Sequence, residues 1–408
     1  MNGRFHTTAM QVATLVALAA VGLACQDTTG PGVEPITQLP RDLTTAEQEI
    51  VAGSNDFAFG LLREVRGLEA DSPNTFLSPL SASMALGMAL NGADGETWTQ
   101  MRDALGFDGL VEDEVNEAYR SLIALLLDLD RSVEVGLGNA IWVDEVTLLP
   151  GFVERTGTHF DATIDPLDFD DPAGADVMNA WVDSVTEGRI PRLVERVDPD
   201  ALLYLINAIY FNADWRSPFD PDATLEGRFT RADGSEVTVD MMADRVGYRT
   251  LNAGDPNAVQ GVELPYGGGA FTAVALLPPE GQAIDEFVAG LDPAAWAAWM
   301  DHFDRAAGTE DPDAEGLLVR MPKFELEWGA SLNDALKALG MTDAFDGQRA
   351  DFTRITDDRD DLFIYDVRQK TYVKVDEEGT EAAAATSVTI GPTSAPPSVT
   401  FDRPFLFA

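Results

Sequence analysis

Residues 376–397 read Asp-Glu-Glu-Gly-Thr-Glu-Ala-Ala-Ala-Ala-Thr-Ser-Val-Thr-Ile-Gly-Pro-Thr-Ser-Ala-Pro-Pro, and their local signals contradict one another. From Thr380 to Ile390 an apolar-leaning face alternates with a small or polar face, which is the pattern of a strand. The four alanines at 382–385 favour a helix instead, and the prolines at 392, 396 and 397 would stop a central strand. A segment that is first an exposed loop and later a strand would satisfy both signals, because small side chains can enter a packed sheet without clashes. An ordinary flexible loop and a short alanine helix are the simpler alternatives.

On either side of this segment the chain has the pattern of one mixed α+β domain. Thr44 and Glu47 form a capping-box pattern before a long helical periodicity, and Ser78-Pro79 opens a second apolar helix. The nearly all-apolar stretch 201–211 is typical of a central strand covered on both faces. We predict further strands at 74–77, 133–143, 236–242, 260–265, 270–277, 317–326 and 371–375, and further helices at 94–101, 115–129, 176–185, 284–291, 293–303 and 331–339. No repeat or second domain-scale linker interrupts the pattern, so we expect a single core.

The N-terminal residues have the features of an export signal. Arg4 and His6 precede an apolar stretch from Val12 to Leu23, which is shorter than the ~20 residues that a membrane span needs. A small residue then precedes Cys25, the chain's single cysteine, which resembles a bacterial lipoprotein cleavage site. We therefore predict a lipoprotein-type signal peptide at 1–25 with lipidation of Cys25, a flexible linker at 26–43 and one domain at 44–408. Simple cleavage and free secretion is the alternative, and export without internal disulfides favours a bacterial source.

The charge balance is strongly acidic, with 70 Asp and Glu against 27 Lys and Arg and a formal net charge of −43. Such a surface repels phosphate backbones and anionic lipids, so we expect no nucleic-acid partner and membrane contact only through a lipid anchor. The simplest interpretation is a solvated acidic surface, and an acidic docking patch for a basic protease is the alternative.

The residues that catalysis would need are nearly absent. Beyond the signal there are two histidines, His159 and His302, and a phenylalanine follows each of them. We interpret both histidines as structural or surface residues. We find no His-Glu-x-x-His, Cys-x-x-Cys, P-loop or Gly-x-Ser-x-Gly motif, and Gly267-Gly268-Gly269 precedes a strand, as in a hairpin turn. The sequence therefore gives no support to an enzyme, a metal site or a cofactor, and we expect none.

Several motifs, in order, resemble those of one family, the serpins. Asp376–Thr386 resembles the hinge of inhibitory serpins. The other matching motifs are Asn74–Ser81, Leu90–Ala93, Gly95–Thr97, Asn207–Phe211, Trp215, Pro218-Phe219, Glu263–Tyr266, Met321–Phe324, Leu339–Met341, Ala344-Phe345, Phe401 and Arg403–Leu406. The resemblance covers about Thr44 to Ala408.

The resemblance implies a fold of three β-sheets and eight or nine helices, with an exposed reactive loop. It implies suicide inhibition: a serine protease cleaves the loop, forms an acyl-enzyme, and is trapped as the loop inserts into the largest sheet. The implied hinge residues are Glu377, Gly379, Thr380, Glu381, Ala382, Ala383, Ala384, Ala385 and Thr386. The implied breach and shutter residues are Trp215, Ser78, Ser81, Asn207 and Gln369.

Counting from the hinge places the reactive bond at Thr393-Ser394, with Pro396-Pro397 in the expected register. No Lys or Arg lies between Lys374 and Arg403, so an elastase-like or subtilisin-like protease fits better than a trypsin-like one. We expect a monomer whose partner is a serine protease. A non-inhibitory binding module of the same fold is the alternative function, and bulky or charged hinge residues would have favoured it.

Two features depart from the family pattern. Gln369 stands where many relatives have a shutter histidine, and because an amide can still form hydrogen bonds we expect an altered latch instead of a lost one. The chain ends at Phe405-Leu406-Phe407-Ala408, where the family continues through a further buried strand, so we expect an incomplete C-terminus.

Overall fold

A computed structural model describes residues 36–69, 72–144, 146–199, 201, 203–246, 249–307, 317–380 and 398–408. Residues 35–408 form one compact unit. Within the described residues, no helix is both long enough and apolar enough to cross a membrane.

Nine α-helices lie in the described part of the chain, and four of them, α1, α2, α3 and α8, begin at a side-chain cap. The predicted capping box is present, since Glu47 N donates to Thr44 Oγ1 at 3.2 Å and Thr44 N donates to Glu47 Oε2 at 2.7 Å. The helices are α1 (Thr45–Leu68), α2 (Pro79–Leu90), α3 (Gly95–Ala104), α4 (Glu112–Asp128), α5 (Pro150–Phe160), α6 (Gly174–Val185), α7 (Ile284–Ala289), α8 (Pro293–Ala307) and α9 (Asn333–Ala338), with short 3-10 turns η1 (Pro221–Ala223) and η2 (Asp343–Phe345).

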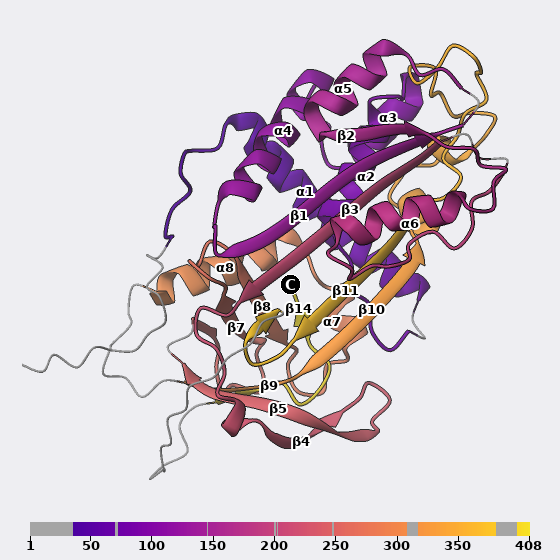
Figure 1. Ribbon diagram of the computed structural model, residues 1–408. Helices are drawn as coiled ribbons and strands as arrows, with labels where there is room; N and C mark the ends of the chain where they lie inside the picture. The colour runs from indigo at the N-terminus through magenta and orange to yellow at the C-terminus, as the bar shows by residue number, and fades with distance from the viewer. Residues whose placement is uncertain are drawn as a thin grey trace, which may run out of the picture. The chain divides into compact units, whose positions relative to one another are not determined.

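The largest sheet consists of two hydrogen-bonded halves instead of one continuous ladder. One half has the order β12 (Gly379–Thr380), β3 (Leu203–Asp214), β1 (Val133–Val143) and β2 (Ala162–Pro166). The other half pairs β10 (Phe324–Ser331) with β11 (Arg368–Val375). Strands β3 and β11 run side by side at the junction without being paired (Figure 1). The three expected sheets are therefore present, with the largest one divided between β3 and β11.

The two remaining sheets are antiparallel apart from one parallel pair. The first has the order β13 (Ser398–Thr400), β9 (Leu317–Pro322), β5 (Glu236–Val246) and β4 (Leu225–Thr230). The second has the order β14 (Leu406–Phe407), β8 (Thr272–Leu277), β7 (Gln260–Pro265) and β6 (Thr250–Leu251). In these two sheets the parallel pair is β13 with β9, and the segment that connects β9 to β13 is long.

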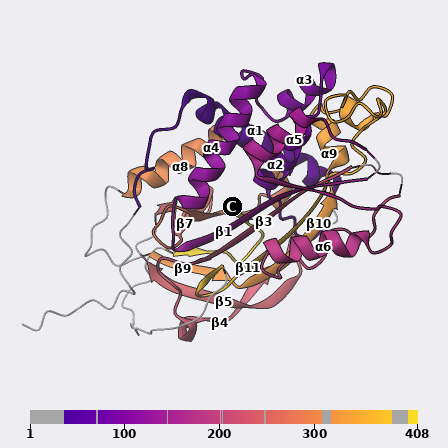
Figure 2. The ribbon, with the colours of Figure 1, turned by 45° about the horizontal axis from the view of Figure 1, so that its top comes forward.

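Alternate residues of β3 pack on opposite faces of the sheet. Ile206 and Ala208 join a core cluster with α6, whereas Leu203 and Leu205 pack against the larger cluster that contains α2. Figure 2 shows α6 on one side of β1 and β3, and α2 and α4 on the other. We call the α2 side the inner face and the α6 side the outer face. The central strand is thus covered on both faces, as its apolar sequence predicted.

Two local predictions differ from the structure. The predicted strand 317–326 is two strands, because Lys323 separates β9 from β10 and its N–H bonds to Asp240 O at 2.9 Å. Residues 74–77 are not a strand, although Thr371 Oγ1 donates to Phe76 O at 2.6 Å. Within residues 26–43, whose role as a linker stays a prediction, Ile36 N donates to Gly268 O at 2.8 Å.

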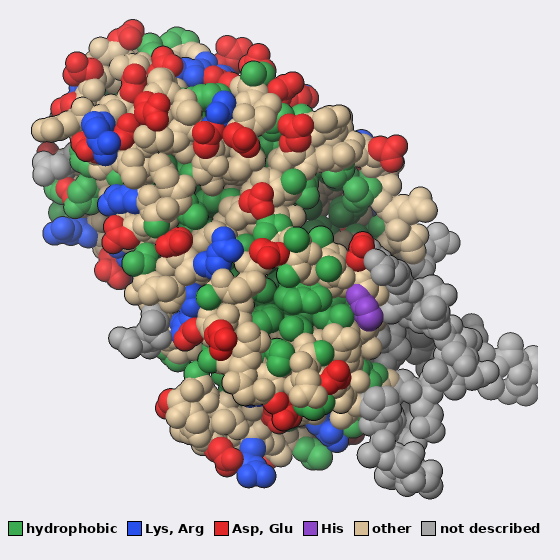
Figure 3. Space-filling model, turned by 180° about the vertical axis from the view of Figure 1, so that it is seen from behind, with side chains coloured by type: hydrophobic (Ala, Val, Ile, Leu, Met, Phe, Trp, Pro, Cys, Tyr) green, Lys and Arg blue, Asp and Glu red, His purple; other side chains and the backbone are tan. Residues whose placement is uncertain are grey.

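The acidic side chains are spread over the face of the molecule that Figure 3 shows. Figure 3 shows carboxylates scattered across the back of the molecule among basic and neutral groups, without a single dominant patch. No group of three or more His, Cys, Asp or Glu side chains among the described residues could hold a metal ion.

Candidate functional site: the hinge and the gap in the largest sheet

The last two described residues of the hinge, Gly379 and Thr380, pair with β3. Gly379 lies opposite Asp214 and Thr380 opposite Ala213, in antiparallel register. Trp215 N donates to Glu378 O at 2.7 Å and extends this contact. A Cβ atom at Gly379 would lie 2.2 Å from Ala213 O, so only glycine fits against the backbone of β3 at this position.

Trp215 ties the base of the hinge to a neighbouring hairpin. Its side chain is 3% exposed and stacks on Tyr266, between β7 and β8, with ring centroids 4.4 Å apart. Its Nε1 donates to Asp376 O at 2.9 Å, so the buried indole has its polar atom satisfied. The Trp215 contact therefore links the end of β3, the hairpin and the start of the hinge, the region that we call the breach.

Glu377 is a buried carboxylate held by one cation and one hydroxyl. It is 8% exposed, and Lys323 Nζ lies 2.8 Å from its Oε2 while Thr224 Oγ1 donates to Oε1 at 2.7 Å. Burial alone would raise its pKa, but the hydrogen bonds from Lys323 and Thr224 outweigh burial and hold the pKa below its usual value. The sequence predicted Glu377 as a hinge residue but did not reveal Lys323 and Thr224 as its partners. The available signal was Lys323 itself, the single lysine of residues 317–331.

The pKa of a second carboxylate, Asp214, is shifted in the opposite direction. Partial burial raises the pKa of Asp214, and the nearby charge of Asp376 raises it further. Asp376 itself has a cation, because Lys374 Nζ lies 2.9 Å from its Oδ2. The backbone pair of Gly379 with Asp214 therefore lies beside two carboxylates, Asp214 and Asp376, that repel each other.

Gln369, Ser78 and Ser81 come together below the inner face. Gln369 is 6% exposed, and its amide makes two hydrogen bonds with the Ser78 backbone, accepting from N at 2.9 Å and donating to O at 2.8 Å. Ser78 Oγ then accepts from Ser81 N at 3.3 Å and caps α2. The glutamine thus joins β11 to the start of α2 with two neutral hydrogen bonds.

Asn207 lies apart from this group and bonds to β1. Its Nδ2 donates to Asn139 Oδ1 at 2.8 Å and lies 4.0 Å from Met84 Sδ of α2. Its Oδ1 is buried and accepts no hydrogen bond within the described structure. Predicted shutter residues are therefore present on both sides of the division between β3 and β11, and one of them has a spare acceptor.

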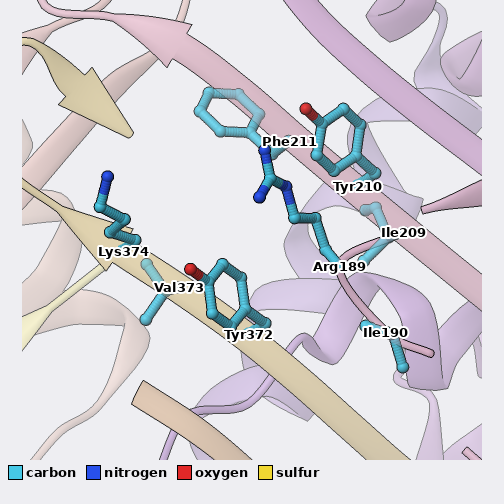
Figure 4. A pocket seen from close by; sticks show the side chains of 8 residues that line it. All are labelled: Arg189, Ile190, Ile209, Tyr210, Phe211, Tyr372, Val373 and Lys374. Atoms are coloured by element: carbon cyan, nitrogen blue, oxygen red, sulfur yellow. The ribbon is translucent and has the colours of Figure 1, made fainter. Parts of the chain in front are cut away.

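A narrow cavity marks this division. Residues 209–211 of β3 and 372–374 of β11 line it, together with Arg189 and Ile190 from the segment after α6 (Figure 4). Its volume of about 30 Å³ is small, on the scale of a single water molecule. A further strand could enter only if β3 and β11 moved apart.

The other predicted site residues lie outside the described residues. They are Glu381, Ala382, Ala383, Ala384, Ala385 and Thr386 of the hinge, the bond Thr393-Ser394, and Cys25. The roles assigned to all the site residues stay predictions.

Comparison with known proteins gives one consistent result. The family model described as "Serpin (serine protease inhibitor)" matches residues 52–408. Curated relatives include Iripin-5 of Ixodes ricinus, 35% identical over 84% of this chain and 86% of that protein, and human antithrombin-III, 30% identical over 90% and 80%.

Solved structures agree with the sequence relatives. Human kallistatin has a TM-score of 0.78 at 27% identity, covering 89% of this chain and 94% of that one. The thermophilic serpin tengpin in its native state has a TM-score of 0.74 at 29% identity, covering 92% of both chains. Thyroxine-binding globulin in complex with thyroxine has a TM-score of 0.74 at 27% identity, covering 87% and 93%.

Proposed function

This chain belongs to the serpin family, whose members are typically inhibitors and not enzymes, and from that premise we propose that it is an inhibitory serpin that traps a serine protease by inserting its cleaved loop between β3 and β11. The observation that carries the proposal is the register of the two hinge pairs, Gly379 with Asp214 and Thr380 with Ala213.

Continuing that register assigns a face of the sheet to each side chain of the loop. Thr386 would lie opposite Asn207 and Val388 opposite Leu205, both on the inner face, since Leu205 packs against the α2 cluster. Directly opposite residues of an antiparallel pair point to the same face. The apolar-leaning half of the alternating loop therefore enters the core, and the small or polar half meets the outer face.

The inserted loop would also satisfy a polar atom that the described structure leaves without a partner. Thr386 would lie opposite Asn207, whose Oδ1 accepts no hydrogen bond, and a threonine hydroxyl can donate one. Because a buried acceptor without a donor is unfavourable, this bond would stabilise the inserted state over the present one.

The preferred target follows from the predicted bond. Thr393 is small and uncharged, so we propose an elastase-like or subtilisin-like serine protease. We further propose that the protein is exported by a bacterium and tethered to a membrane through Cys25, on the support of the apolar stretch 12–23 and the small residue before the cysteine. A Cys25→Ser variant expressed in bacteria is expected to move from the membrane fraction to the soluble exported fraction. Unchanged fractionation would contradict lipid anchoring.

The test of inhibition mixes the full chain with an elastase-like protease and separates the products on a denaturing gel. We expect a covalent band at the summed mass and a released peptide that begins at Ser394. The matched variant is Thr386→Arg, which keeps the reactive bond but places a charge at an inner-face position; it is expected to be cleaved without forming the band. Clean cleavage of both proteins would refute inhibition and favour the non-inhibitory binding module.

A further inference from the structure

The first described residue of the domain, Ile36, lies at the breach. Its N–H donates to Gly268 O at 2.8 Å, and a Cβ atom added at Gly268 would lie 3.0 Å from Ile36 Cδ1. Gly268 belongs to the hairpin between β7 and β8, as does Tyr266, whose ring stacks on Trp215. Ile36 is therefore held at the end of the largest sheet where the hinge pairs with β3.

The backbone to which Ile36 bonds is itself firmly held. Gly268 N donates to Asp130 Oδ2 at 2.8 Å and to Ser132 Oγ at 3.0 Å, which ties the hairpin to the start of β1. Arg216 Nη1 donates to Gly268 O at 3.1 Å, so this carbonyl has a side-chain donor and the Ile36 N–H. Ile36 thus leaves the domain from a point that is fixed relative to the sheet.

A second contact holds the chain a few residues further on. The Arg41 guanidinium donates to both carboxylate oxygens of Glu47, at 2.8 and 2.5 Å, and Arg41 Nη2 donates to Ser121 Oγ at 2.7 Å. Residues 36–41 are therefore fastened to the domain at both ends. The free chain ahead of the domain ends at Ile36, well before α1 begins.

The predicted lipid anchor is close to this exit point in the sequence. Cys25 and Ile36 are 11 positions apart. A chain of that length reaches at most ~38 Å, and a flexible one spans about 18 Å on average. The 12 residues of β3 run from the far end of the sheet to the breach, a distance of ~40 Å.

We propose that the anchored protein presents the breach, where its reactive loop begins, towards the membrane, and that its target is a serine protease held at the same membrane surface. This inference rests on the proposed function, both the anchor and the inhibition. With the far end towards the membrane, Ile36 would stand at least ~40 Å above it, beyond the ~38 Å reach of the tether. The net charge of −43 gives the domain no attraction to an anionic bilayer that would favour another orientation.

The size of a protease makes this orientation selective. A serine protease of ~230 residues has a radius of gyration of about 17 Å and is roughly 45 Å across. That exceeds the ~38 Å that the tether allows between the breach and the bilayer. Soluble proteases therefore have restricted access to the loop, whereas a protease held at the same membrane meets it at a raised effective concentration.

The first test measures height above the membrane by fluorescence energy transfer. The full chain is purified with its lipid, labelled at one introduced cysteine and placed in neutral phosphatidylcholine vesicles that contain an acceptor lipid. Arg131→Cys puts the dye at the breach, where the native side chain is 91% exposed. Gln348→Cys puts it on an exposed residue after η2, in the orange chain at the end where β3 begins (Figure 1). The Arg131 dye should lose at least about twice as much emission, because the two dyes differ in height by about the length of β3.

Two changes to the tether are the controls. A 20-residue Gly-Ser insertion after Gly32 raises the reach to ~110 Å and should make the two dyes equal. Ile36→Pro removes the N–H that bonds to Gly268 O, moves the exit point to Arg41 and should narrow the difference. Equal transfer for the two dyes on the natural tether would overturn the orientation. Dye uptake by the protein without an introduced cysteine would reveal a free Cys25 and overturn the anchor with it.

The second test compares one elastase-like protease free in solution with the same protease coupled to the vesicles. The vesicle-bound inhibitor should trap the coupled protease at least about tenfold faster than the free one. The free protease should react faster with soluble Cys25→Ser protein than with the vesicle-bound form, and the tether insertion should remove that difference. Equal rates throughout would overturn the preference for a membrane-held target. A lack of covalent complex in every mixture would refute inhibition, while the dye measurement would still decide the orientation.

Discussion

Replacing Gly379 by alanine should detach the hinge from β3. The added methyl would lie 2.2 Å from Ala213 O, 2.6 Å from Asp214 Cα and 2.9 Å from Trp215 N, all of them backbone atoms that cannot rotate away. Relief requires a shift of about 1 Å, which breaks the ladder bonds of β12 and the 2.7 Å bond from Trp215 N to Glu378 O. At about 1 kcal/mol for each of two or three bonds, the paired hinge loses about 2–3 kcal/mol, or roughly 30- to 150-fold in its population.

The assay is the stoichiometry of inhibition together with the thermal midpoint. Gly379→Ala should turn most encounters with protease into clean cleavage, because the first pairs of the inserted strand no longer form. The matched control is Gly67→Ala, near the end of α1, where nothing lies within 4 Å of an added Cβ atom. That control should keep full inhibition and gain up to ~1 kcal/mol of helix stability. An unchanged stoichiometry for Gly379→Ala would refute the claim that β12 pairing initiates insertion.

Three further predictions concern the shutter, the breach and the reactive bond. Gln369→Ala leaves the Ser78 N–H and C=O without partners and should lower the free energy of unfolding by about 2 kcal/mol, measured by urea titration, with exposed Gln348→Ala as a neutral control. Glu377 has a lowered pKa, so its ionised form stabilises the native protein above pH ~4.5, and this contribution is lost as the pH falls through the lowered pKa. Glu377→Gln should flatten that acid-side loss in a series of thermal midpoints, and an unchanged slope would contradict the assignment. Thr393→Arg should create a covalent complex with a trypsin-like protease on a denaturing gel, and cleavage at any other bond would move the predicted site.

Most strands and helices were predictable because their signals are local. The strand 133–143 was predicted with the observed bounds, and the apolar run 201–211 was correctly interpreted as a strand covered on both faces. The strand expected at 74–77 was wrong because Phe76 satisfies its carbonyl through the Thr371 side chain instead of a ladder. The role of Lys323 as the partner of Glu377 was not predicted, because it depends on two segments meeting in space.

Some features of the candidate site were also visible in the sequence, and others depended on the tertiary structure. Period-two alternation over 380–390 already indicated a segment able to become a strand, because side-chain alternation is a property of the chain alone. Which two strands it could lie between depended on the tertiary structure. The division between β3 and β11 and the spare acceptor of Asn207 arise from segments roughly 70 to 170 residues apart, whose contacts depend on packing and not on local propensity.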